Sequence, residues 1–546
     1  MSQTYNMVDY DKTYAEFKWE VPEYYNFARD VLDKWAEDPN KLAIWWVDDE
    51  GNEVKKTFAE LCKRSRQLCN VLTQQGVKRG DVVIVVLPRL IEWWEINIAC
   101  LRMGAVISPG TTQLTAKDLK YRFDSAEAVC VITDADNAPK VDEIRSECPT
   151  VKSFILVQAQ RDGWVNYEDA VSSASDQFET ADTRHDENAI LYFTSGTTGY
   201  PKMTVHTHAS YPYGHIITGK YWLDLRPDDL HWNLSDTGWA KAAWSSLFGP
   251  WNCGAALFVH HTPRFDVKKT LHYLEKYPIT TMCGPPTAYR MFVLEDLSKY
   301  NFKTLRHVVA AGEPLNPEII ETWEKHTGLK IRDGYGQTES VCMVGTFPCL
   351  EVRPGSMGKP SPGFVVEVID DDGNIVPRGQ EGDIAVKVKP ERPVGLFKEY
   401  WKNPEKTASC YRGDWYVTGD RAIKDEDGYL WFVGRSDDVI LASGYRIGPF
   451  EVESALLEHP AVAESAVVSS PDEVRGEVVK AFVILAPGYQ PSDELVKELQ
   501  DHVKRVTAPY KYPRKIEFVD SLPKTISGKI RRVELREREW AGWKKK

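Results

Sequence analysis

A hydroxyl-rich loop closed by a lysine constrains this chain more than any other feature. The loop reads Thr194-Ser195-Gly196-Thr197-Thr198-Gly199-Tyr200-Pro201-Lys202 and follows directly on the apolar run 189–193. Such a run is typical of a strand buried on both faces of a parallel sheet. Hydroxyls, unhindered backbone N–H groups and a lysine after a strand suit a polyphosphate. The loop is not a Walker A sequence, because G-x-x-x-x-G-K-[ST] cannot be laid over it. A hydroxyl-rich turn without a ligand is the alternative interpretation.

The first half of the chain alternates short apolar runs with amphipathic segments. This pattern predicts an α/β fold with layered helices and much parallel sheet. A helix is expected from Phe58 to Gln75, because Thr57 and Glu60 match a capping box and Gly76 supplies a stop. Buried strands are expected at 82–87, 128–133, 153–157, 189–193 and 255–259.

The pattern changes from about Gly355 onward. Paired β patterns at 365–369 and 384–388, and another after Asp427-Gly428, predict a β-rich subdomain over about 340–433. A charged turn at 434–438 then precedes a predicted helix (449–458) and strands (464–468 and 479–485). We therefore predict a large N-terminal domain, residues 1–436, and a small α+β C-terminal domain, residues 437–546.

Composition excludes some classes of function. At 546 residues the chain is too long for one core. Its formal charge of −12 argues against a nucleic-acid surface, and its ten cysteines lack metal-binding spacing, which favours a reduced protein. We find no secretory signal and no run near the roughly 18 apolar residues of a membrane span. These features predict a soluble, cytoplasmic protein.

Four further segments carry side chains suited to nucleotide chemistry. Ala311-Gly312-Glu313-Pro314 follows a strand pattern, where α/β proteins tend to bind ligands. Asp333-Gly334-Tyr335-Gly336-Gln337-Thr338-Glu339 offers an aromatic face, a hydroxyl and a carboxylate suited to Mg²⁺. Tyr416-Val417-Thr418-Gly419-Asp420 offers a carboxylate for ribose hydroxyls, and Pro523-Lys524-Thr525-Ile526-Ser527-Gly528-Lys529 places a lysine behind a flexible turn. Each segment alone is a weak signal.

Together and in this order, the five segments closely resemble those of the ANL superfamily of adenylate-forming enzymes. The resemblance covers roughly residues 50–535 and implies a large domain joined by a hinge to a small mobile domain. It implies ATP, Mg²⁺ and coenzyme A, with catalytic roles for Lys529, Lys202, Thr338 and Glu339, and with Glu339 as the metal ligand. The residues implied to bind ATP or AMP are Thr194, Ser195, Gly196, Thr197, Thr198, Gly199, Lys202, Gly312, Glu313, Pro314, Asp333, Gly334, Tyr335, Gly336, Gln337, Thr338, Asp420, Arg435 and Lys529.

The resemblance also implies a hinge and a thiol acceptor. Asp437 matches the hinge at which the small domain swings between two half-reactions. Ser443 and Gly444 match the segment that faces the thioesterification site. Arg446, Arg475 and Lys504 are candidates for the phosphates of coenzyme A, and surface ion pairing is the alternative for all three.

The acid is predicted from the expected acyl pocket, Trp239, Ala240, Lys241, Trp244, Ala311 and Gly336. The chain most resembles the medium-chain acyl-CoA synthetase branch. Acetyl-CoA synthetases usually carry a tryptophan at the position of Gly336, and here Trp244 is able to fill that space from another wall. We therefore expect short- to medium-chain acids, including branched ones, and acetate or propionate stay open. The alternative is that Trp244 simply packs in the core.

Other functions within the resemblance also stay open. They are a peptide-synthetase adenylation module, a free-standing aryl- or amino-acid-adenylating enzyme, a luciferase-type oxygenase and a non-catalytic nucleotide-binding regulator. Retention of Lys202, Glu339, Asp420, Arg435 and Lys529 argues against the regulator. The physiological direction and a homodimeric assembly are left open by the sequence.

Overall fold

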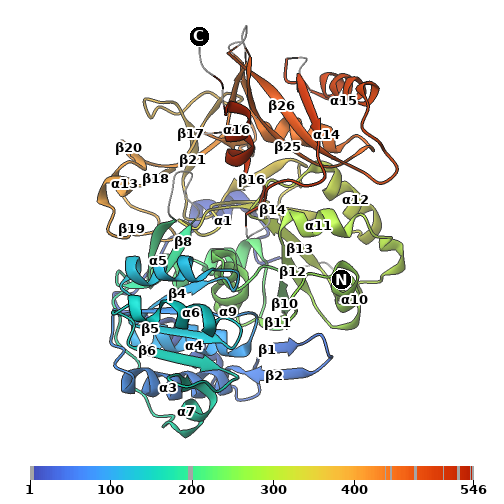
Figure 1. Ribbon diagram of the computed structural model, residues 1–546. Coiled ribbons are helices and arrows are strands. Elements are labelled where there is room, and N and C mark those ends of the chain that lie inside the picture. Colours follow the sequence, from blue (N-terminus) through green and yellow to red (C-terminus); the bar gives the residue numbers. More distant parts are fainter. Residues whose placement is uncertain are drawn as a thin grey trace.

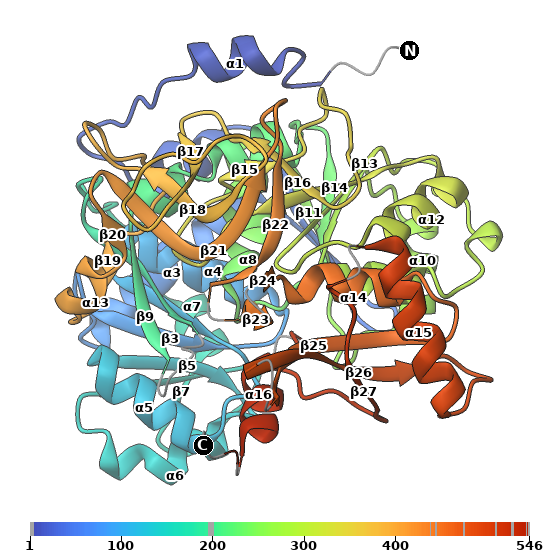
Figure 2. The ribbon, with the colours of Figure 1, turned by 90° about the horizontal axis from the view of Figure 1, so that it is seen from above.

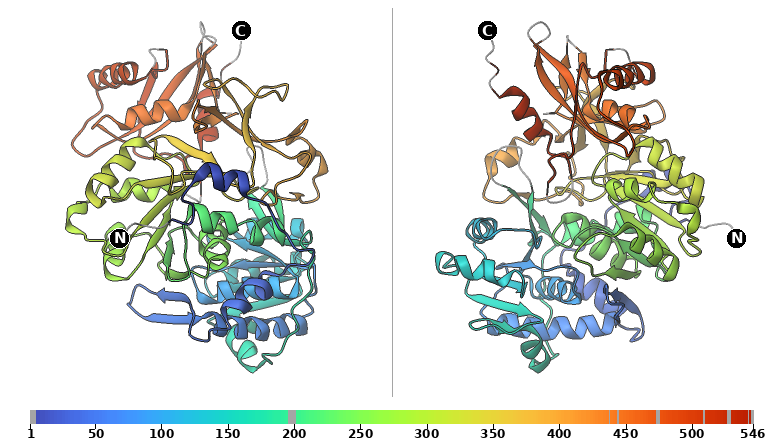
Figure 3. Two further views of the ribbon diagram at one scale, coloured as in Figure 1. Left: turned by 180° about the vertical axis from the view of Figure 1, so that it is seen from behind. Right: turned by 45° about the vertical axis from the view of Figure 1, so that its right-hand side comes forward.

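The computed structural model describes residues 5–194, 201–436, 438–442, 445–472, 476–507, 510–525, 529–541 and 543. A small domain lies on top of a large one, and the N-terminal half of the large domain forms its base (Figure 1). The same arrangement is seen from behind and from the side in Figure 3. This is the layered α/β architecture with a smaller α+β domain that the sequence predicts.

The first sheet of the large domain contains the strand that leads into the hydroxyl-rich loop. Its strand order is β19-β9-β8-β4-β3-β5-β6-β7. The strands from β8 to β7 in this order are parallel to one another. β9 pairs antiparallel with β8, and β19 pairs antiparallel with β9. The bounds are β3 (Val82–Val86), β4 (Val106–Gly110), β5 (Cys130–Asp134), β6 (Ser153–Val157), β7 (Val165–Asn166), β8 (Asn188–Thr194), β9 (Lys202–Thr207) and β19 (Glu399–Tyr400).

Helices cover this sheet, and the predicted capping box is present at the first of them. The Thr57 hydroxyl accepts from the Glu60 N–H at 3.2 Å, and the Glu60 carboxylate accepts from the Thr57 N–H at 2.8 Å. Gly76, at φ +86°, lies just beyond the end of the helix, as expected of a stop residue. The helices are α3 (Phe58–Gln74), α4 (Ile91–Met103), α5 (Ala116–Ala126), α6 (Ala138–Ile144) and α7 (Tyr167–Ser173).

The second sheet joins an α/β half to the β-rich region. Its order is β17-β18-β21-β22-β16-β15-β14-β13-β12-β10-β11-β1-β2. The parallel half contains β1 (Leu42–Val47), β10 (Leu230–Asn233), β11 (Ala256–His260), β12 (Thr281–Gly284), β13 (His307–Ala311) and β14 (Ile331–Tyr335), edged by antiparallel β2 (Glu53–Thr57). Its helices include α8 (Ala240–Ala243), α9 (Gly249–Asn252), α10 (Val267–Lys276), α11 (Pro286–Phe292) and α12 (Pro317–Thr327).

The β-rich region is continuous with this sheet, which the sequence patterns did not indicate. β15 (Val344–Gly345) and β16 (Ser356–Pro360) pair antiparallel between β14 and β22 and so bridge the two parts. Close backbone approach makes the bridge possible, because a Cβ at Gly358 would lie 2.2 Å from the Gly345 carbonyl. The remaining elements are β17 (Val366–Ile369), β18 (Glu381–Lys387), α13 (Pro404–Ala408), β20 (Tyr411–Arg412), β21 (Trp415–Lys424) and β22 (Leu430–Arg435).

The small domain packs helices on a separate sheet. Figure 2 shows it beside the β-rich region, seen from above. Its strands are β25 (Val462–Asp472), antiparallel to β26 (Gly476–Leu485), which pairs parallel with β27 (Lys515–Phe518). The other elements are the hairpin of β23 (Ile440–Ala442) and β24 (Tyr445–Ile447), and α14 (Pro449–Leu457), α15 (Asp493–Val506) and α16 (Arg532–Trp540). The Asn316 side chain donates to the Ser454 hydroxyl at 3.0 Å, so the two domains are in contact.

The N-terminal helix α1 (Tyr10–Glu16) ties the chain start to the β-rich region. The hydroxyls of Tyr10 and Tyr14 donate to the carbonyls of Pro360 and Phe364, both at 2.8 Å. Among the described residues, no helix combines the length and apolar character that crossing a membrane requires.

Candidate active site

A buried carboxylate organises the nucleotide end of the site. Asp420, on β21, is only 4% exposed, yet it accepts from the Tyr335 hydroxyl at 2.6 Å and from the Gln337 amide at 2.7 Å. The Arg435 guanidinium lies 3.4 Å from its other oxygen. Burial raises the pKa of Asp420, while Arg435 and the two hydrogen bonds oppose that rise. Three predicted nucleotide residues therefore converge on one carboxylate.

The C-terminal end of β14, which begins the glycine-rich segment 333–339, packs against the indole of Trp222. Burial keeps the pKa of Tyr335 well above its ordinary value, so its phenol stays protonated and donates to Asp420. A Cβ at Gly334 would lie 2.3 Å from the Trp222 ring, whose N–H donates to the Asp333 carbonyl at 3.1 Å. Only glycine fits there. Asp333 itself is buried, which raises its carboxyl pKa well above the usual range.

A neutral histidine fixes the backbone next to the predicted catalytic residues. His206 Nε2 lies 2.7 Å from the Thr338 carbonyl, and burial lowers the pKa of His206 to about 3. The imidazole is therefore uncharged at neutral pH and donates from Nε2 to the carbonyl. The Phe397 N–H donates to the Glu339 carbonyl at 2.7 Å. The turn is thus fixed from two sides.

Lys202 and Glu339 both lie close to the side chain of Tyr400. The Tyr400 hydroxyl donates to Glu339 at 2.7 Å, and the Lys202 ammonium lies 5.5 Å from the centre of the same ring. Thr194 pairs with Lys202 in the β8–β9 register, so both ends of the hydroxyl-rich loop are fixed side by side. Ser195, Gly196, Thr197, Thr198 and Gly199 lie outside the described residues.

An ion pair holds the turn after β13. Glu313 accepts from Arg290 at 2.8 Å and from the Thr287 hydroxyl at 2.9 Å. Burial alone would raise the pKa of Glu313, but the Arg290 charge and these hydrogen bonds bring it below its ordinary value. Gly312 takes a left-handed φ of +102°, which favours glycine. Pro314 follows directly, so the predicted segment 312–314 borders the site as expected.

Lys529 reaches this cluster from the small domain. Its charge interacts with Glu313, Asp420 and Arg435, which belong to three different strands or turns of the large domain. Desolvation by the surrounding protein lowers the pKa of Lys529, although the residue as a whole is solvent-exposed, and the two carboxylates oppose the shift. Its N–H donates to the Thr525 hydroxyl at 3.1 Å. The predicted lysine and ribose carboxylate, more than one hundred residues apart, thus share one site.

The residues predicted for the acyl side are held mainly by packing contacts. The indole of Trp244 is 5% exposed and donates to the Tyr211 hydroxyl at 2.7 Å. A Cβ at Gly336 would lie 2.3 Å from that indole and 2.4 Å from the Val341 carbonyl. Trp244 therefore lies over Gly336, and its role in limiting the length of the acid stays a prediction.

Lys241 borders the same region. Its ammonium donates to the Ala311 carbonyl, and a Cβ at Gly312 would lie 3.0 Å from it. Burial lowers the pKa of Lys241. Trp239 caps α8 at its N-terminal end and Ala240 begins it. The predicted acyl residues therefore border the nucleotide turns.

The predicted hinge and most predicted coenzyme A residues are not described. Asp437, Ser443, Gly444 and Arg475 lie outside the described residues, as does the side chain of Arg446. Lys504 pairs with Asp501 at 2.9 Å and lies 4.3 Å from the centre of the Tyr512 ring. In this arrangement Lys504 makes the surface ion pair that was its alternative interpretation.

A single carboxylate would suit Mg²⁺ here. The described residues contain no group of three or more His, Cys, Asp or Glu side chains able to hold a metal ion. Mg²⁺ commonly uses one or two carboxylates and takes its other ligands from phosphate and water. Glu339 fits that pattern, because the Tyr400 contact occupies one of its oxygens and no described contact occupies the other.

Several site residues were missed by sequence reasoning. Five residues outside the five motifs contact predicted site residues: Tyr400 contacts Glu339, Arg290 and Thr287 contact Glu313, His206 contacts the Thr338 carbonyl, and Tyr211 contacts Trp244. No local pattern distinguishes them from ordinary core or surface residues. Of the five, Tyr400 lies in β19 and pairs with Thr204 of the Lys202 strand β9, a pairing that is visible only in the sheet order.

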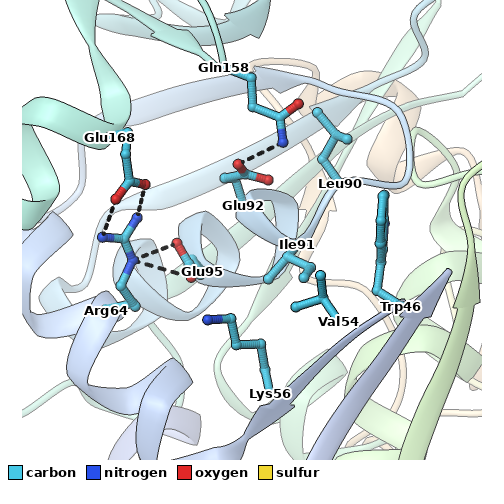
Figure 4. Close-up of a pocket in the computed structure, with 10 residues that line it drawn as sticks. All are labelled: Trp46, Val54, Lys56, Arg64, Leu90, Ile91, Glu92, Glu95, Gln158 and Glu168. Carbon is cyan, nitrogen blue, oxygen red and sulfur yellow. Dashed lines mark hydrogen bonds and ion pairs between the residues drawn. The ribbon is translucent and has the colours of Figure 1, made fainter. Parts of the chain in front are cut away.

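Two cavities differ in their relation to these residues. One of about 510 Å³ includes Lys202, Tyr400, Thr418 and Arg435 in its wall and so borders the nucleotide end. Another of about 320 Å³ lies at the base, between β2, α3, α4 and α7 (Figure 4). Its Arg64 is paired with Glu95 and Glu168, and its wall contains none of the predicted site residues. We assign that cavity no chemistry.

Comparison with known proteins places the chain in a family. The model of the AMP-binding enzyme family matches residues 32–401, and that of its C-terminal domain matches residues 451–529. Rat acyl-coenzyme A synthetase ACSM3, mitochondrial, is 56% identical over 98% of this chain and 94% of its own. The human protein of that name is 54% identical, with coverage of 98% and 93%.

A solved structure of similar shape carries an adenylate. It is the anthranilate CoA ligase AuaEII in complex with anthranoyl-AMP, with a TM-score of 0.87 at 31% identity. The match covers 95% of this chain and 98% of that one. Acyl-CoA synthetase from Brucella canis is 34% identical with a TM-score of 0.75, and coverage is 97% and 99%. The two-domain ANL fold predicted from the motifs is confirmed.

The predicted cytoplasmic location is wrong. The relatives at 53–56% identity are mitochondrial acyl-coenzyme A synthetases. The sequence argument tested only for a secretory signal and a membrane span, and neither feature distinguishes the cytosol from the interior of an organelle. The motif order, the convergence of Lys529 and Asp420, and these matches agree: the chain belongs to the AMP-binding enzyme family and is an AMP-forming acyl-CoA synthetase.

Proposed function

We propose that this synthetase activates short- to medium-chain carboxylic acids, including branched ones, with Lys529 as the central catalytic residue. The observation that carries the proposal is the electrostatic interaction of Lys529, from the small domain, with Glu313, Asp420 and Arg435 of the large domain. A lysine from the small domain at the nucleotide end is the arrangement that the first half-reaction needs.

In the first half-reaction two anions must meet. A carboxylate oxygen attacks the α-phosphorus of ATP, the bond from that phosphorus to the β-phosphate bridging oxygen breaks, and diphosphate leaves. Lys529 and Lys202 offset the repulsion and the charge that develops on the phosphoryl oxygens. Thr338 is assigned to the α-phosphate, because its backbone is held by His206 while its side chain carries a hydroxyl.

The nucleotide itself is assigned to the residues around Asp420. Asp420 accepts hydrogen bonds from the ribose hydroxyls, and Arg435 is the second contact. The segment 333–338 contacts the adenine, with Gly312, Glu313 and Pro314 on its other side. Thr194, Ser195, Gly196, Thr197, Thr198, Gly199 and Lys202 are assigned to the β- and γ-phosphates.

Mg²⁺ belongs to the proposal as a partner of Glu339. When bound, it neutralises charge on the phosphate oxygens of the leaving diphosphate. The contribution of the chain is to orient the carboxylate, through the hydrogen bond from Tyr400.

The second half-reaction transfers the acyl group to coenzyme A. The thiol sulfur attacks the acyl carbon, the bond from that carbon to the AMP oxygen breaks, and the thiol loses its proton. Lys529 stands where the thiol would approach, so we propose that the small domain swings about Asp437 between the steps. Ser443, Gly444, Arg446, Arg475 and Lys504 are assigned to coenzyme A in that second arrangement.

The length of the acid is assigned to Trp244. Because its indole lies over Gly336 and is held by Tyr211, a deep channel along that wall is blocked. Trp239, Ala240, Lys241 and Ala311 line the remaining space. An aryl acid is the second candidate, because a relative of 31% identity is named as an anthranilate CoA ligase.

Exchange of labelled diphosphate into ATP tests the proposal. A panel of straight, branched and aromatic acids should give acid-dependent exchange without coenzyme A, and thioester with it. Exchange that is greatest for aromatic acids would favour the second candidate. Failure of every acid, with folded protein that binds AMP, would contradict the proposal.

The assembly of the chain is a separate prediction. A homodimer would be recognised by sedimentation velocity at several protein concentrations. The net charge of −12 supports the absence of a nucleic-acid partner.

A further inference from the structure

The cavity at the nucleotide end has an excess of positive charge. Its volume is about 510 Å³, and its cationic side chains are Lys202, Lys406, Arg412, Arg421 and Arg435. Two carboxylates, Asp371 and Asp383, also line it, and Arg421 and Arg435 are further paired with Glu381 and Asp420, so among the described residues only Lys202 and Lys406 of these cations have no ion pair. Asp383 is already paired, at 2.9 Å with Arg412 and at 3.2 Å with Arg421. In a chain of net charge −12, such a cavity suits an anion.

Lys406 lies outside the five motifs, as do Arg412 and Arg421, but those two arginines pair with Asp383. Lys406 lies on α13, which is joined to β19 at one edge of the molecule (Figure 2). The Lys406 N–H is capped by the Asn403 side chain at 3.0 Å, and the Tyr400 N–H donates to the Thr407 hydroxyl at 3.0 Å. The backbone of Lys406 is therefore fixed relative to Tyr400, which contacts Glu339.

Lys406 lines the cavity beside the other cations. No ion pair of Lys406 is found within the part of the chain that the structure describes. Lys402, four residues earlier, makes a clear contrast, because its ammonium pairs with Glu127 at 2.6 Å. A half-buried cation that stays unpaired beside other cations is costly unless an anion joins it.

Lys406 and Lys202 act on each other across the cavity. Desolvation lowers the pKa of Lys202, and the nearby charge of Lys406 lowers it further. Glu339 opposes the shift only in part. Two like charges that face one cavity are relieved together by a ligand that carries several negative charges.

We propose that Lys406 is a further diphosphate-binding residue, which contacts the terminal phosphates of ATP beside Lys202 and then the diphosphate that leaves. This inference rests on the proposed function, because it assumes that the phosphate end of ATP points toward Lys202. The ligand class is a phosphoanhydride, and its two sources, the tail of bound ATP and free diphosphate, are separated by titration.

The test is calorimetric titration of the full-length chain with three probes: MgATP, inorganic diphosphate and AMP. In Lys406→Ala, the Kd for MgATP and for diphosphate should rise about tenfold, the loss of roughly one charge-assisted hydrogen bond. The Kd for AMP should stay unchanged, because AMP lacks the terminal phosphates. Lys406→Arg should restore most of the loss, and Lys402→Ala is the matched control that should change nothing.

The outcomes separate the two proposals. An unchanged Kd for both MgATP and diphosphate in Lys406→Ala would overturn the role of Lys406. An equal loss for AMP would also overturn it, because a general disturbance of the site would then explain the effect. A wild-type chain that binds neither MgATP nor AMP would instead overturn the proposed function. A larger loss for MgATP than for diphosphate would support the contact in the bound triphosphate.

Discussion

The two ends of the active site are built in different ways. At the nucleotide end, Asp420, Tyr335, Gln337 and Arg435 form a polar cluster with distances of 2.6–3.4 Å. At the acyl end, Trp244 is fixed by one hydrogen bond and by contact with the backbone at Gly336. Under the proposed function, the first end binds the nucleotide, which is the same in every reaction, and the second end sets which acid fits.

This difference indicates at which end of the site substitutions change the specificity for the acid. A buried polar cluster is intolerant, because removal of one partner leaves another unsatisfied. A packed apolar wall accepts other shapes of similar volume at lower cost. Substitutions at the nucleotide end should therefore affect every acid equally, and substitutions at the acyl end should change the order of preference among acids.

The largest effect is expected at Lys529. Lys529→Ala should slow adenylate formation by about 10²–10³, because it removes one charge donor at the reacting phosphate. Thioester formation from a supplied acyl adenylate should be retained, and rapid-quench measurement of each half-reaction checks this. An equal loss in both halves would contradict the swing of the small domain between the two steps.

The next largest effect is expected at Asp420. Asp420→Asn keeps the shape but removes the charge beside Arg435, so the Kd for AMP should rise about 10–100-fold. The ratio of kcat/KM between any two acids should stay constant. Asp425→Asn, in the turn between β21 and β22 where Asp425 pairs with Arg353, is the control. A change in acid preference would break the division between the two ends.

A smaller and selective effect is expected at Trp244. Trp244→Ala should raise kcat/KM for acids a few methylenes longer by about tenfold relative to the shortest acids. It should also destabilise the fold by about 3–5 kcal/mol, and Trp244→Leu is the milder variant if folding fails. Steady-state kinetics across a homologous acid series measures the effect. If the acid preference is unchanged and only stability is lost, Trp244 is a core residue. Trp323→Leu, at a buried tryptophan on α12, is the control that is expected to lose stability alone.

The smallest effect is a shift in the pH profile. The lowered pKa of Lys529 means that its ammonium loses its proton at a lower pH than a free lysine. Adenylation should therefore decline on the alkaline side, as pH rises through that lowered pKa. Lys529→Arg should move the decline to higher pH, because a guanidinium stays charged. Single-turnover adenylation across the pH range measures it, and identical alkaline limbs would count against Lys529 as the charge donor.

Much of the fold followed from local patterns. The buried strands at 82–87 and 153–157 and the capped helix after Thr57 lie within one or two residues of their predicted bounds. The helix at 449–458 also agrees, and the strands at 464–468 and 479–485 exist but are longer in the structure, at 462–472 and 476–485. The continuity of the β-rich region with the second sheet did not follow, because it depends on the short pairings of β15 and β16.

The sequence by itself determined the chemistry of this protein. Its ordered motifs placed a lysine, a phosphate loop and two carboxylates in the pattern of an adenylate-forming enzyme, because that chemistry needs those residue types next to sharp turns. Tertiary structure alone decided which distant side chains serve them: Tyr400 at Glu339, Lys406 beside Lys202, and Trp244 over Gly336. These contacts depend on packing between segments far apart in the chain, and no local pattern encodes such distances.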